Sequence, residues 1–287
     1  MTTTLAADLD NTTRTWFITG ASSGIGLELT RAAARRGDRV AALARNTAKM
    51  QPLADEFGDR IVVLQGDVVD PASTQAAVAA TVAAFGRIDV VANNAGYGFF
   101  GAVEEASDKQ ARMVFDTNVF GVLNVLRAVL PVLRAQRGGH VVQGSSYYGQ
   151  TAHPGVGLLA ATKYAVEGLT DALVGELAPL GIGVTLVEPG PTATAFLDNL
   201  ELATTNDDYQ VVRDVQKSIG ELPPSAFNDP ARVAAAILTA VDAEHPPLRL
   251  ATGTHAVKEI RAALTARLAQ IDAWEATSAE VDCVGAV

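Results

Sequence analysis

A glycine-rich stretch at residues 15–26 constrains the fold of this chain more than any other segment. It reads TWFITGASSGIG, in which a short apolar run precedes three glycines, and a helix-like segment follows at 25–36. This order predicts a buried strand, a tight turn and the start of a helix. Glycines let a backbone approach a pyrophosphate closely, and a helix N-terminus offers unpaired N–H groups to an anion. The stretch therefore predicts a dinucleotide-binding unit, the alternative being a turn that only packs a helix on a strand.

Composition limits the classes of protein to which the chain can belong. An α/β fold of 287 residues is ordinarily one domain, and a hydrophobic fraction of 48% is ample for a core. A net charge of −10 argues against a general nucleic-acid or anionic-membrane role, because both need a positive surface. The sequence also lacks the roughly 18 uninterrupted apolar residues that a membrane span requires. We therefore expect a small-molecule substrate, and neither a nucleic-acid nor a membrane partner.

The two ends of the chain read as tails around one domain. Residues 1–13 have no basic patch and no long apolar core, so they do not resemble a secretory signal. They are predicted to be a flexible tail, and 276–287 a loose C-terminal one. The single cysteine, Cys283, excludes an intrachain disulfide, which fits a reducing compartment. We expect a cytoplasmic protein whose one dinucleotide-binding and catalytic domain spans 14–275.

The remaining segments alternate between the patterns of strands and helices. Further apolar strands are predicted at 39–44, 60–66, 88–92, 140–144, 184–188 and 248–251. Helical patterns occupy 72–85, 108–136, 160–179, 229–241 and 255–274. Right-handed crossovers between such strands place helices on both faces of a parallel sheet. The sequence therefore predicts a Rossmann-type, doubly wound α/β fold with about seven parallel strands.

The end of the second predicted strand bears on the choice of nucleotide. Ala44 stands where a dinucleotide fold would place an acidic residue against the adenosine ribose, and Arg45 follows it. A carboxylate suits a free 2′-hydroxyl, whereas a cation suits a 2′-phosphate. This position predicts NADP(H) in preference to NAD(H), the alternative being that Arg45 is only a solvated loop residue.

Several motifs together resemble the classical short-chain dehydrogenase/reductase family, from about residue 15 to about residue 250. The first stretch has the spacing Thr-Gly-x-x-x-Gly-x-Gly, Asn-Asn-Ala-Gly follows a strand at 93–96, and Lys163 lies in Ala-Thr-Lys-Tyr-Ala. The resemblance implies a nicotinamide cofactor and the residues that hold it. These are Gly20, Ser22, Ser23, Gly24, Ile25, Gly26, Arg45, Asp67, Val68, Asn93, Ala95, Gly96, Lys163, Pro189, Gly190, Thr192 and Thr194. Asp67 could also cap a turn, and the two roles can coexist.

The resemblance breaks in the catalytic set. Carbonyl reduction by hydride transfer needs a proton donor at the developing alkoxide, a second donor to hold the oxygen and a nearby cation. The family supplies tyrosine, serine and lysine, with the tyrosine four residues before the lysine. Ser146 and Lys163 fit this pattern, but Leu159 occupies the position of the tyrosine. Asn118 resembles the family asparagine that bends a helix and holds a relay water, although a buried asparagine is usually a hydrogen-bonding core residue.

Leucine cannot donate a proton, so three hypotheses remain. In the first, another acid takes over: Tyr148 is the main candidate, beside Tyr147 and His153, although tyrosines at a cleft are common for packing alone. In the second, the protein uses the cofactor site for isomerisation, dehydration or cyclisation. In the third, it is a catalytically silent cofactor-binding subunit, or an altered variant of an active reductase.

Four more segments bear on substrate and assembly. Residues 195–224 are polar and poorly periodic, as expected for a mobile substrate lid. The lid and the two tyrosines favour a hydrophobic carbonyl or alcohol substrate. The family resemblance implies a homodimer or homotetramer formed through helices at 119–136 and 160–179. Residues 255–274 alternate apolar and charged residues at helical spacing and predict a docking or interface helix.

Overall fold

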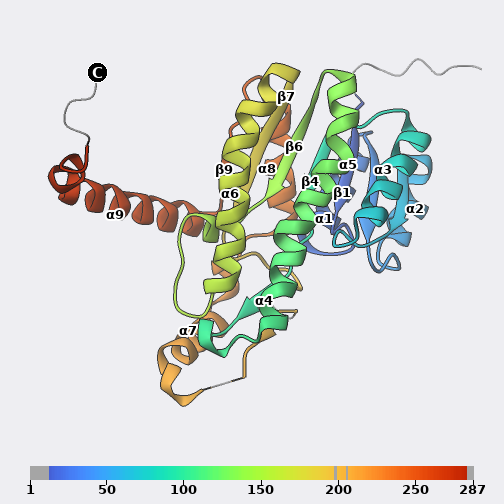
Figure 1. Cartoon of the computed structure of the whole chain (residues 1–287). Helices are drawn as coiled ribbons and strands as arrows, with labels where there is room; N and C mark the ends of the chain where they lie inside the picture. The colour runs from blue at the N-terminus through green and yellow to red at the C-terminus, as the bar shows by residue number, and fades with distance from the viewer. Residues whose placement is uncertain (1–12, 197–198, 205, 283–287) are drawn as a thin grey trace, which may run out of the picture.

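A parallel sheet of seven strands runs through the centre of the structure (Figure 1). The computed structural model describes residues 13–196, 199–204 and 206–282. The strands are β1 (Thr15–Thr19), β2 (Arg39–Ala44), β3 (Ile61–Gln65), β4 (Val90–Asn93), β6 (Gly139–Gly144), β7 (Ile182–Pro189) and β9 (Arg249–Thr252). They lie in the order β3-β2-β1-β4-β6-β7-β9, and every pairing is parallel. The predicted Rossmann-type sheet is therefore confirmed.

Helices cover both faces of the sheet, which explains why its strands read as unbroken apolar runs. One face packs against α1 (Gly24–Arg35), α2 (Gln51–Phe57) and α8 (Pro230–Asp242). The other packs against α3 (Pro71–Phe85), α5 (Gly121–Gln136) and α6 (Gly157–Leu177). Within β1, Trp16 and Ile18 join the first layer and Phe17 joins the second, as the alternation of side chains along a strand requires.

The order of the strands in the sheet indicates where a ligand binds. It reverses between β1 and β4, which are neighbours in the sheet although β2 and β3 lie between them in sequence. In open α/β sheets the crevice at the carboxyl ends of such strands is where ligands bind. The glycine turn follows β1, and Asn-Asn-Ala-Gly begins at the end of β4, so both predicted motifs meet at this crevice.

Residues 108–136, predicted as one long helix or a pair, form three consecutive helical pieces. These are α4 (Asp108–Phe115), a π-helical turn (Asp116–Phe120) and α5. By length and composition this stretch is apolar enough to cross a membrane, but 44% of its most apolar window is buried inside the structure. Its buried side chains, among them Val125 and Val129, belong to the core beneath the sheet.

Two predicted segments differ from the structure. The segment 195–224, predicted to lack periodic structure, contains β8 (Glu201–Leu202), which pairs with β5 (Phe99–Phe100), and α7 (Gln210–Gly220). The apolar side of α7 packs against Phe100. The C-terminal tail predicted from residue 276 begins later, because α9 (Thr254–Ala279) remains helical to Ala279. Residues 1–12, 197–198, 205 and 283–287 lie outside the described residues, and with them most of the predicted N-terminal tail.

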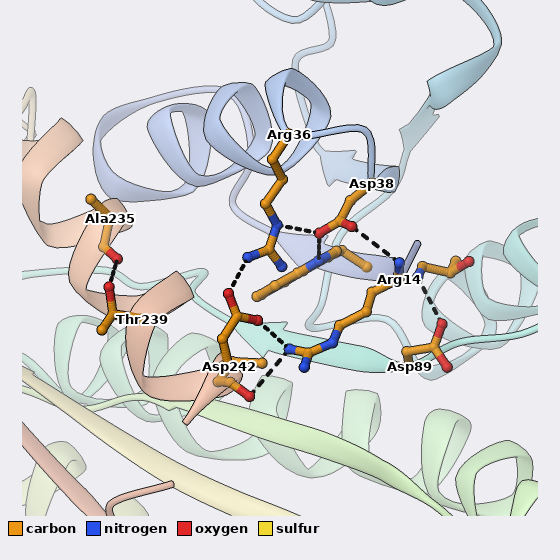
Figure 2. Close-up of polar contacts among 10 residues, drawn as sticks. Arg14, Arg36, Asp38, Asp89, Ala235, Thr239 and Asp242 are labelled. Atoms are coloured by element: carbon orange, nitrogen blue, oxygen red, sulfur yellow. Dashed lines mark hydrogen bonds and ion pairs between the residues drawn. The ribbon is translucent and has the colours of Figure 1, made fainter. Parts of the chain in front are cut away.

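A polar cluster ties the start of β1 to the end of α8 (Figure 2). The buried carboxylate of Asp38 accepts hydrogen bonds from Trp16 Nε1 at 2.8 Å and Arg36 Nε at 2.6 Å. The more exposed Asp242, at the end of α8, accepts from Arg14 Nη1 at 2.7 Å and Arg36 Nη1 at 2.6 Å. Arg36 therefore bridges Asp38 and Asp242, and this bridge links the start of β1 to the end of α8.

Replacing Asp38 with alanine should lower the free energy of unfolding by about 2–4 kcal/mol, because the buried indole N–H and part of the Arg36 guanidinium lose their acceptor. The matched control Asp242→Ala removes a side chain that is 46% exposed. It should cost less than about 1 kcal/mol, since exposed ion pairs contribute little. Urea denaturation measures the free energy of unfolding of both variants. If the two variants lose equal amounts, burial of Asp38 does not explain its contribution to stability.

Candidate active site

One cavity of about 1400 Å³ connects the predicted motifs. It extends over the glycine turn and the ends of β2, β4, β6 and β7, and it reaches the segment 195–224. The predicted cofactor-binding residues that line it are Gly20, Ser22, Ser23, Gly24, Ile25, Arg45, Asp67, Val68, Asn93, Ala95, Gly96, Lys163, Pro189, Gly190, Thr192 and Thr194. Gly26 is buried and is not among the lining residues. The fold thus brings the predicted set together, while the contact of each member with a cofactor stays a prediction.

The glycines of the turn stand where a side chain has no room. A Cβ atom on Gly20, whose φ is +64°, would lie 2.8 Å from the Cα of Ala95. A Cβ on Gly26 would lie 2.4 Å from the carbonyl oxygen of Gly20. Gly24 has a φ of +54°, and a Cβ there would meet Thr194 at 3.0 Å. The turn is therefore a backbone cradle, and it leads into the N-terminus of α1.

Asn94 holds this cradle in position, a role that the sequence did not assign to it. Its side-chain Nδ2 donates to the carbonyl oxygens of Thr19 at 3.2 Å and Gly20 at 3.4 Å. In return, the hydroxyl of Thr19 accepts from the backbone N–H groups of Asn94 and Ala95, both at 3.1 Å. The signal was present in the motif Asn-Asn-Ala-Gly, but the sequence does not say which asparagine turns toward the glycines.

Two cations stand at the end of the cavity beyond β2. Arg45 and Lys49 are both exposed and line the cavity, and Lys49 was missed at the sequence level. Ala44 is buried and offers no carboxylate to a ribose. Asp67, which also lines the cavity, accepts from the backbone N–H of Val69 at 3.1 Å. The turn-capping role left open for Asp67 is therefore present.

Lys163 and Ser146 both line the cavity. The ammonium group of Lys163 donates to the carbonyl oxygen of Gly144 at 2.7 Å. Burial lowers its pKa from 10.5 to about 8, opposed by the charge of Glu167. Ser146, at the end of β6, accepts from the backbone N–H of Tyr148 at 3.2 Å through its hydroxyl oxygen. Leu159 is buried on α6, one turn before Lys163, and its side chain lines the same cavity.

The loop after β7 is held by a hydrogen bond to β9 and by two of its own threonine hydroxyls. The N–H of Gly190 donates to the carbonyl oxygen of Thr252 at 3.0 Å, and the Thr192 hydroxyl donates to the carbonyl oxygen of Gly190 at 2.9 Å. The hydroxyl of Thr194 accepts from the N–H of Phe196 at 3.3 Å. These contacts fix the loop along the cavity wall, between the glycine turn and the segment 195–224.

Asn118 occupies the π-helical turn and is buried. Its Oδ1 accepts from the N–H of Tyr97 at 2.7 Å. Its Nδ2 donates to the carbonyl oxygen of Tyr97 at 2.9 Å and to the Thr162 hydroxyl at 3.0 Å. The hydrogen-bonding core role is therefore present. A relay role for Asn118 stays a prediction.

Tyr148 and His153 form a hydrogen-bonded pair that lines the cavity. The ring Nδ1 of His153 lies 3.0 Å from the carbonyl oxygen of Pro154, a contact that requires an N–H at that nitrogen. The Nε2 atom therefore accepts a hydrogen bond from the Tyr148 hydroxyl, at 2.5 Å. The neighbouring Tyr147 is packed between other rings, 4.0 Å from Tyr148 and 5.4 Å from His255 between centroids. Burial raises the pKa of Tyr147 to about 12 and raises that of Tyr148 as well, so both phenols keep their protons at neutral pH.

Two buried carboxylates lie beyond Lys163, and the sequence did not single them out. Glu167 follows Lys163 by one turn of α6, and Glu188 lies near the end of β7. Gln150 Nε2 donates to both, at 3.1 Å and 3.0 Å, and Arg249 Nε donates to Glu167 at 3.0 Å. Burial, together with the charge of Glu167, raises the pKa of Glu188 from 4.5 to about 7.

The part of the cavity nearest the segment 195–224 is apolar. Its lining includes Phe99, Phe100, Val156, Leu159, Phe196, Leu200, Leu202, Ile219, Leu222 and Phe227. Segment 195–224 is held against the body by the β5–β8 pairing and by ion pairing between Arg213 and Glu105. The cavity thus has a polar end beside the glycine turn and an apolar end under α7.

Comparisons with known proteins agree with this geometry. A family model described as short chain dehydrogenase matches residues 14–204. The oxidoreductase BOA17 of Botryotinia fuckeliana is 36% identical, over 93% of this chain and 98% of that protein. A solved short-chain dehydrogenase from Streptomyces avermitilis has a TM-score of 0.89 and 36% identity, and the match covers 96% of this chain and 100% of that one. A short-chain dehydrogenase/reductase from Burkholderia phymatum, solved in complex with NAD, has a TM-score of 0.76 and 25% identity over 87% and 92%.

The carboxylate pair gives the folded protein a pH dependence. Because Glu188 binds a proton more tightly in the folded state, the stability that this proton contributes is lost as pH rises from 4.5 to about 7. Glu188→Gln keeps an acceptor for Gln150 without the charge. It should therefore raise the free energy of unfolding by about 1–3 kcal/mol near pH 8 and change it little near pH 5.

Urea denaturation at the two pH values measures this difference. The control Glu176→Gln changes an exposed carboxylate on α6 and should have little effect at either pH. A stability change in Glu188→Gln that is equal at the two pH values would contradict the raised pKa of Glu188.

Proposed function

Because the chain belongs to the short-chain dehydrogenase family, we propose that it is an NADP(H)-dependent oxidoreductase acting on a hydrophobic carbonyl or alcohol substrate. The observation that carries the proposal is the single cavity that joins the glycine cradle, Lys163 and Ser146 to an apolar chamber. The cradle fits a dinucleotide, since its glycines leave the space that side chains would fill. A bound nicotinamide nucleotide would supply or accept the hydride, and residues of this chain would orient the substrate and move the proton.

Support for NADP(H) over NAD(H) comes from the charges at the end of β2. Arg45 and Lys49 line the cavity there, beside the uncharged Ala44. A 2′-phosphate at this end would gain charge-assisted hydrogen bonds, whereas a free 2′-hydroxyl would lack the carboxylate that usually accepts from it. We propose the preference for NADP(H) over NAD(H) from the charges at this end of the cavity alone.

The apolar chamber supports a hydrophobic substrate. A substrate carbonyl beside Ser146 would receive a hydrogen bond from the serine hydroxyl, and the ammonium group of Lys163 would stabilise negative charge nearby. The rest of the substrate would lie against the aromatic and aliphatic side chains under α7. Each methylene group buried there contributes about 0.8 kcal/mol to binding.

The proton donor is the part of the mechanism that this chain must supply differently. Leu159 offers no proton, whereas Tyr148 lines the cavity and is only half-buried, unlike the buried Tyr147. The Tyr148 hydroxyl donates to Nε2 of His153. Turned toward a substrate oxygen, the same hydroxyl would donate its proton there. Tyr148 is accordingly our candidate substitute acid.

A second candidate function is cofactor binding without redox turnover, and Leu159 is the observation that favours it. A positioned acid contributes roughly 10²–10⁴-fold to such reactions. A protein that replaced this acid with an aliphatic side chain and gained nothing elsewhere would be an isomerase, dehydratase or cyclase on the same fold, or a silent subunit. The cradle and Lys163 would serve these functions as well.

We also propose that the chain assembles as a homodimer or homotetramer through α5 and α6 and resides in the cytoplasm. The large apolar side chains of Phe120 and Tyr164 are exposed at the start of α5 and on α6, which supports the assembly. The location rests on cysteine usage, since the single Cys283 has no intrachain partner.

We expect NADPH to bind with a dissociation constant in the micromolar range and at least about tenfold more tightly than NADH. The double variant Arg45→Asp, Lys49→Ala should remove or reverse this preference, because an aspartate accepts from a 2′-hydroxyl and repels a 2′-phosphate. Titration calorimetry with both nucleotides measures it.

The control Arg232→Asp changes an exposed cation on α8, outside the cavity lining, and should leave both affinities unchanged. If neither nucleotide binds at millimolar concentration, the cofactor proposal fails. If the preference survives in the double variant, the role of Arg45 fails.

Leu159→Tyr should raise ketone reduction at least tenfold over a panel of hydrophobic ketones, because it places a phenol one turn before Lys163. NADPH affinity should stay the same, which separates an effect on chemistry from one on binding. In the wild-type background, Tyr148→Phe should abolish residual turnover, while the matched Tyr147→Phe should retain it.

Steady-state kinetics with NADPH consumption as the readout measures all three variants. No gain in Leu159→Tyr would mean that a missing acid is not what limits the wild-type enzyme. Unchanged turnover in Tyr148→Phe would exclude Tyr148 as the substitute.

A further inference from the structure

Helix α9 carries an apolar stripe that no residue in the described part of the chain covers. Val257, Leu264, Leu268 and Ile271 recur at spacings of seven, four and three residues, which places them along one side of the helix. Their exposed fractions run from 42% to 65%, and that of the neighbouring Trp274 is 65%. Exposed apolar residues scattered singly are ordinary, but a continuous row of large ones marks an interaction surface.

The helix leaves the body of the protein partway along its length (Figure 1). Its first half is anchored by the buried Ala256 and by Arg267, whose guanidinium donates to the carbonyl oxygen of Gln150 at 2.5 Å. Beyond Arg267, every residue from 268 to 279 is exposed. Isolated helices shorter than about 12–15 residues are marginal in water, and most helices in proteins are stabilised by packing of their apolar side. The outer half of α9 therefore needs a partner.

The charges along α9 indicate what that partner is. Lys258, Arg261 and Arg267 outnumber the one acidic residue of the inner half, Glu259, whereas the charged residues of the outer half, Asp272 and Glu275, are both acidic. Arg261 and Asp272 are eleven residues apart, about three turns of helix, so they flank the stripe on the same side. An antiparallel second α9 would bring the acidic outer half of each helix onto the basic inner half of the other. An anionic membrane surface would instead be repelled by the outer half.

We propose that α9 pairs with α9 of a second copy of this chain, antiparallel and stripe to stripe, about a two-fold axis near Leu268. In this arrangement Leu264 lies opposite Ile271 of the second copy, and Arg261 lies beside its Asp272. A two-fold axis repeats each contact, so the pair contains two such ion pairs. Val257 and Leu264 remain exposed on the anchored half, which leaves room for the incoming helix. The proposed α9 interface borders α6, because Arg267 of α9 donates a hydrogen bond to the Tyr164 hydroxyl, and it does not depend on the proposed activity.

Sedimentation velocity of the full chain tests the interface. The double variant Leu264→Glu, Ile271→Glu should halve the mass of the assembly, because it puts charges in the centre of both contacts. Both residues are exposed, so the fold should be retained, and an unchanged far-UV circular dichroism spectrum and melting temperature check this. The control Ala269→Glu, an exposed position on the far side of the helix, should keep the wild-type mass. An unchanged mass in the double variant would overturn the proposal.

A charge swap tests the orientation. Arg261→Asp should weaken the association at least tenfold, because it opposes like charges at two places in the pair. Adding Asp272→Arg to the same chain should restore the affinity to within about threefold of wild type, since each pair then has opposite charges again. Failure of the second change to rescue the first would overturn the antiparallel arrangement. Co-flotation of the wild-type chain with phosphatidylcholine and phosphatidylserine vesicles through the same stripe would also overturn it, in favour of a membrane surface.

Discussion

The close approach of two backbone segments at the switch point of the sheet is the constraint on which the site depends. The turn after β1 and the segment after β4 pass so near each other that a Cβ on Gly20 would collide with Ala95. Asn94 fixes the approach by hydrogen bonding to the carbonyl oxygens on the other side. The cradle is thus built from backbone, held by one amide side chain and placed at the end of a helix, which is what an anionic ligand requires.

The chemistry of the site is set by which charges the fold buries. Lys163 is held by a carbonyl oxygen and by the field of Glu167, and its lowered pKa reflects how little water surrounds it. One turn before it on α6, Leu159 adds an apolar wall to the cavity. In the function that we propose, the electrostatic part of the catalytic set is kept, and another residue supplies the proton. A tyrosine and histidine pair on the neighbouring loop is arranged so that a proton can pass between them.

The sequence predicts the sheet well because its strands are buried on both faces and read as continuous apolar runs. It predicts the cofactor end of the site because glycine spacing and Asn-Asn-Ala-Gly are local patterns. It misses Asn94 as the brace, and the Glu167 and Glu188 pair, because these contacts join segments far apart in the chain. It also misses α7, whose few apolar residues at 212, 215 and 219 are diluted by charged neighbours. It ends α9 too early, since no glycine or proline between Trp274 and Ala279 stops the helix.

The central claim is that the glycine cradle holds a nicotinamide nucleotide while an aliphatic side chain faces it in place of a phenol. A crystal structure of the protein with bound NADP⁺ tests this most directly. The account predicts the pyrophosphate at the N-terminus of α1, the 2′-phosphate beside Arg45, and Leu159 next to the nicotinamide with Lys163 at its ribose. A nucleotide bound elsewhere, or a phenol from α6 against the nicotinamide ring, would contradict it.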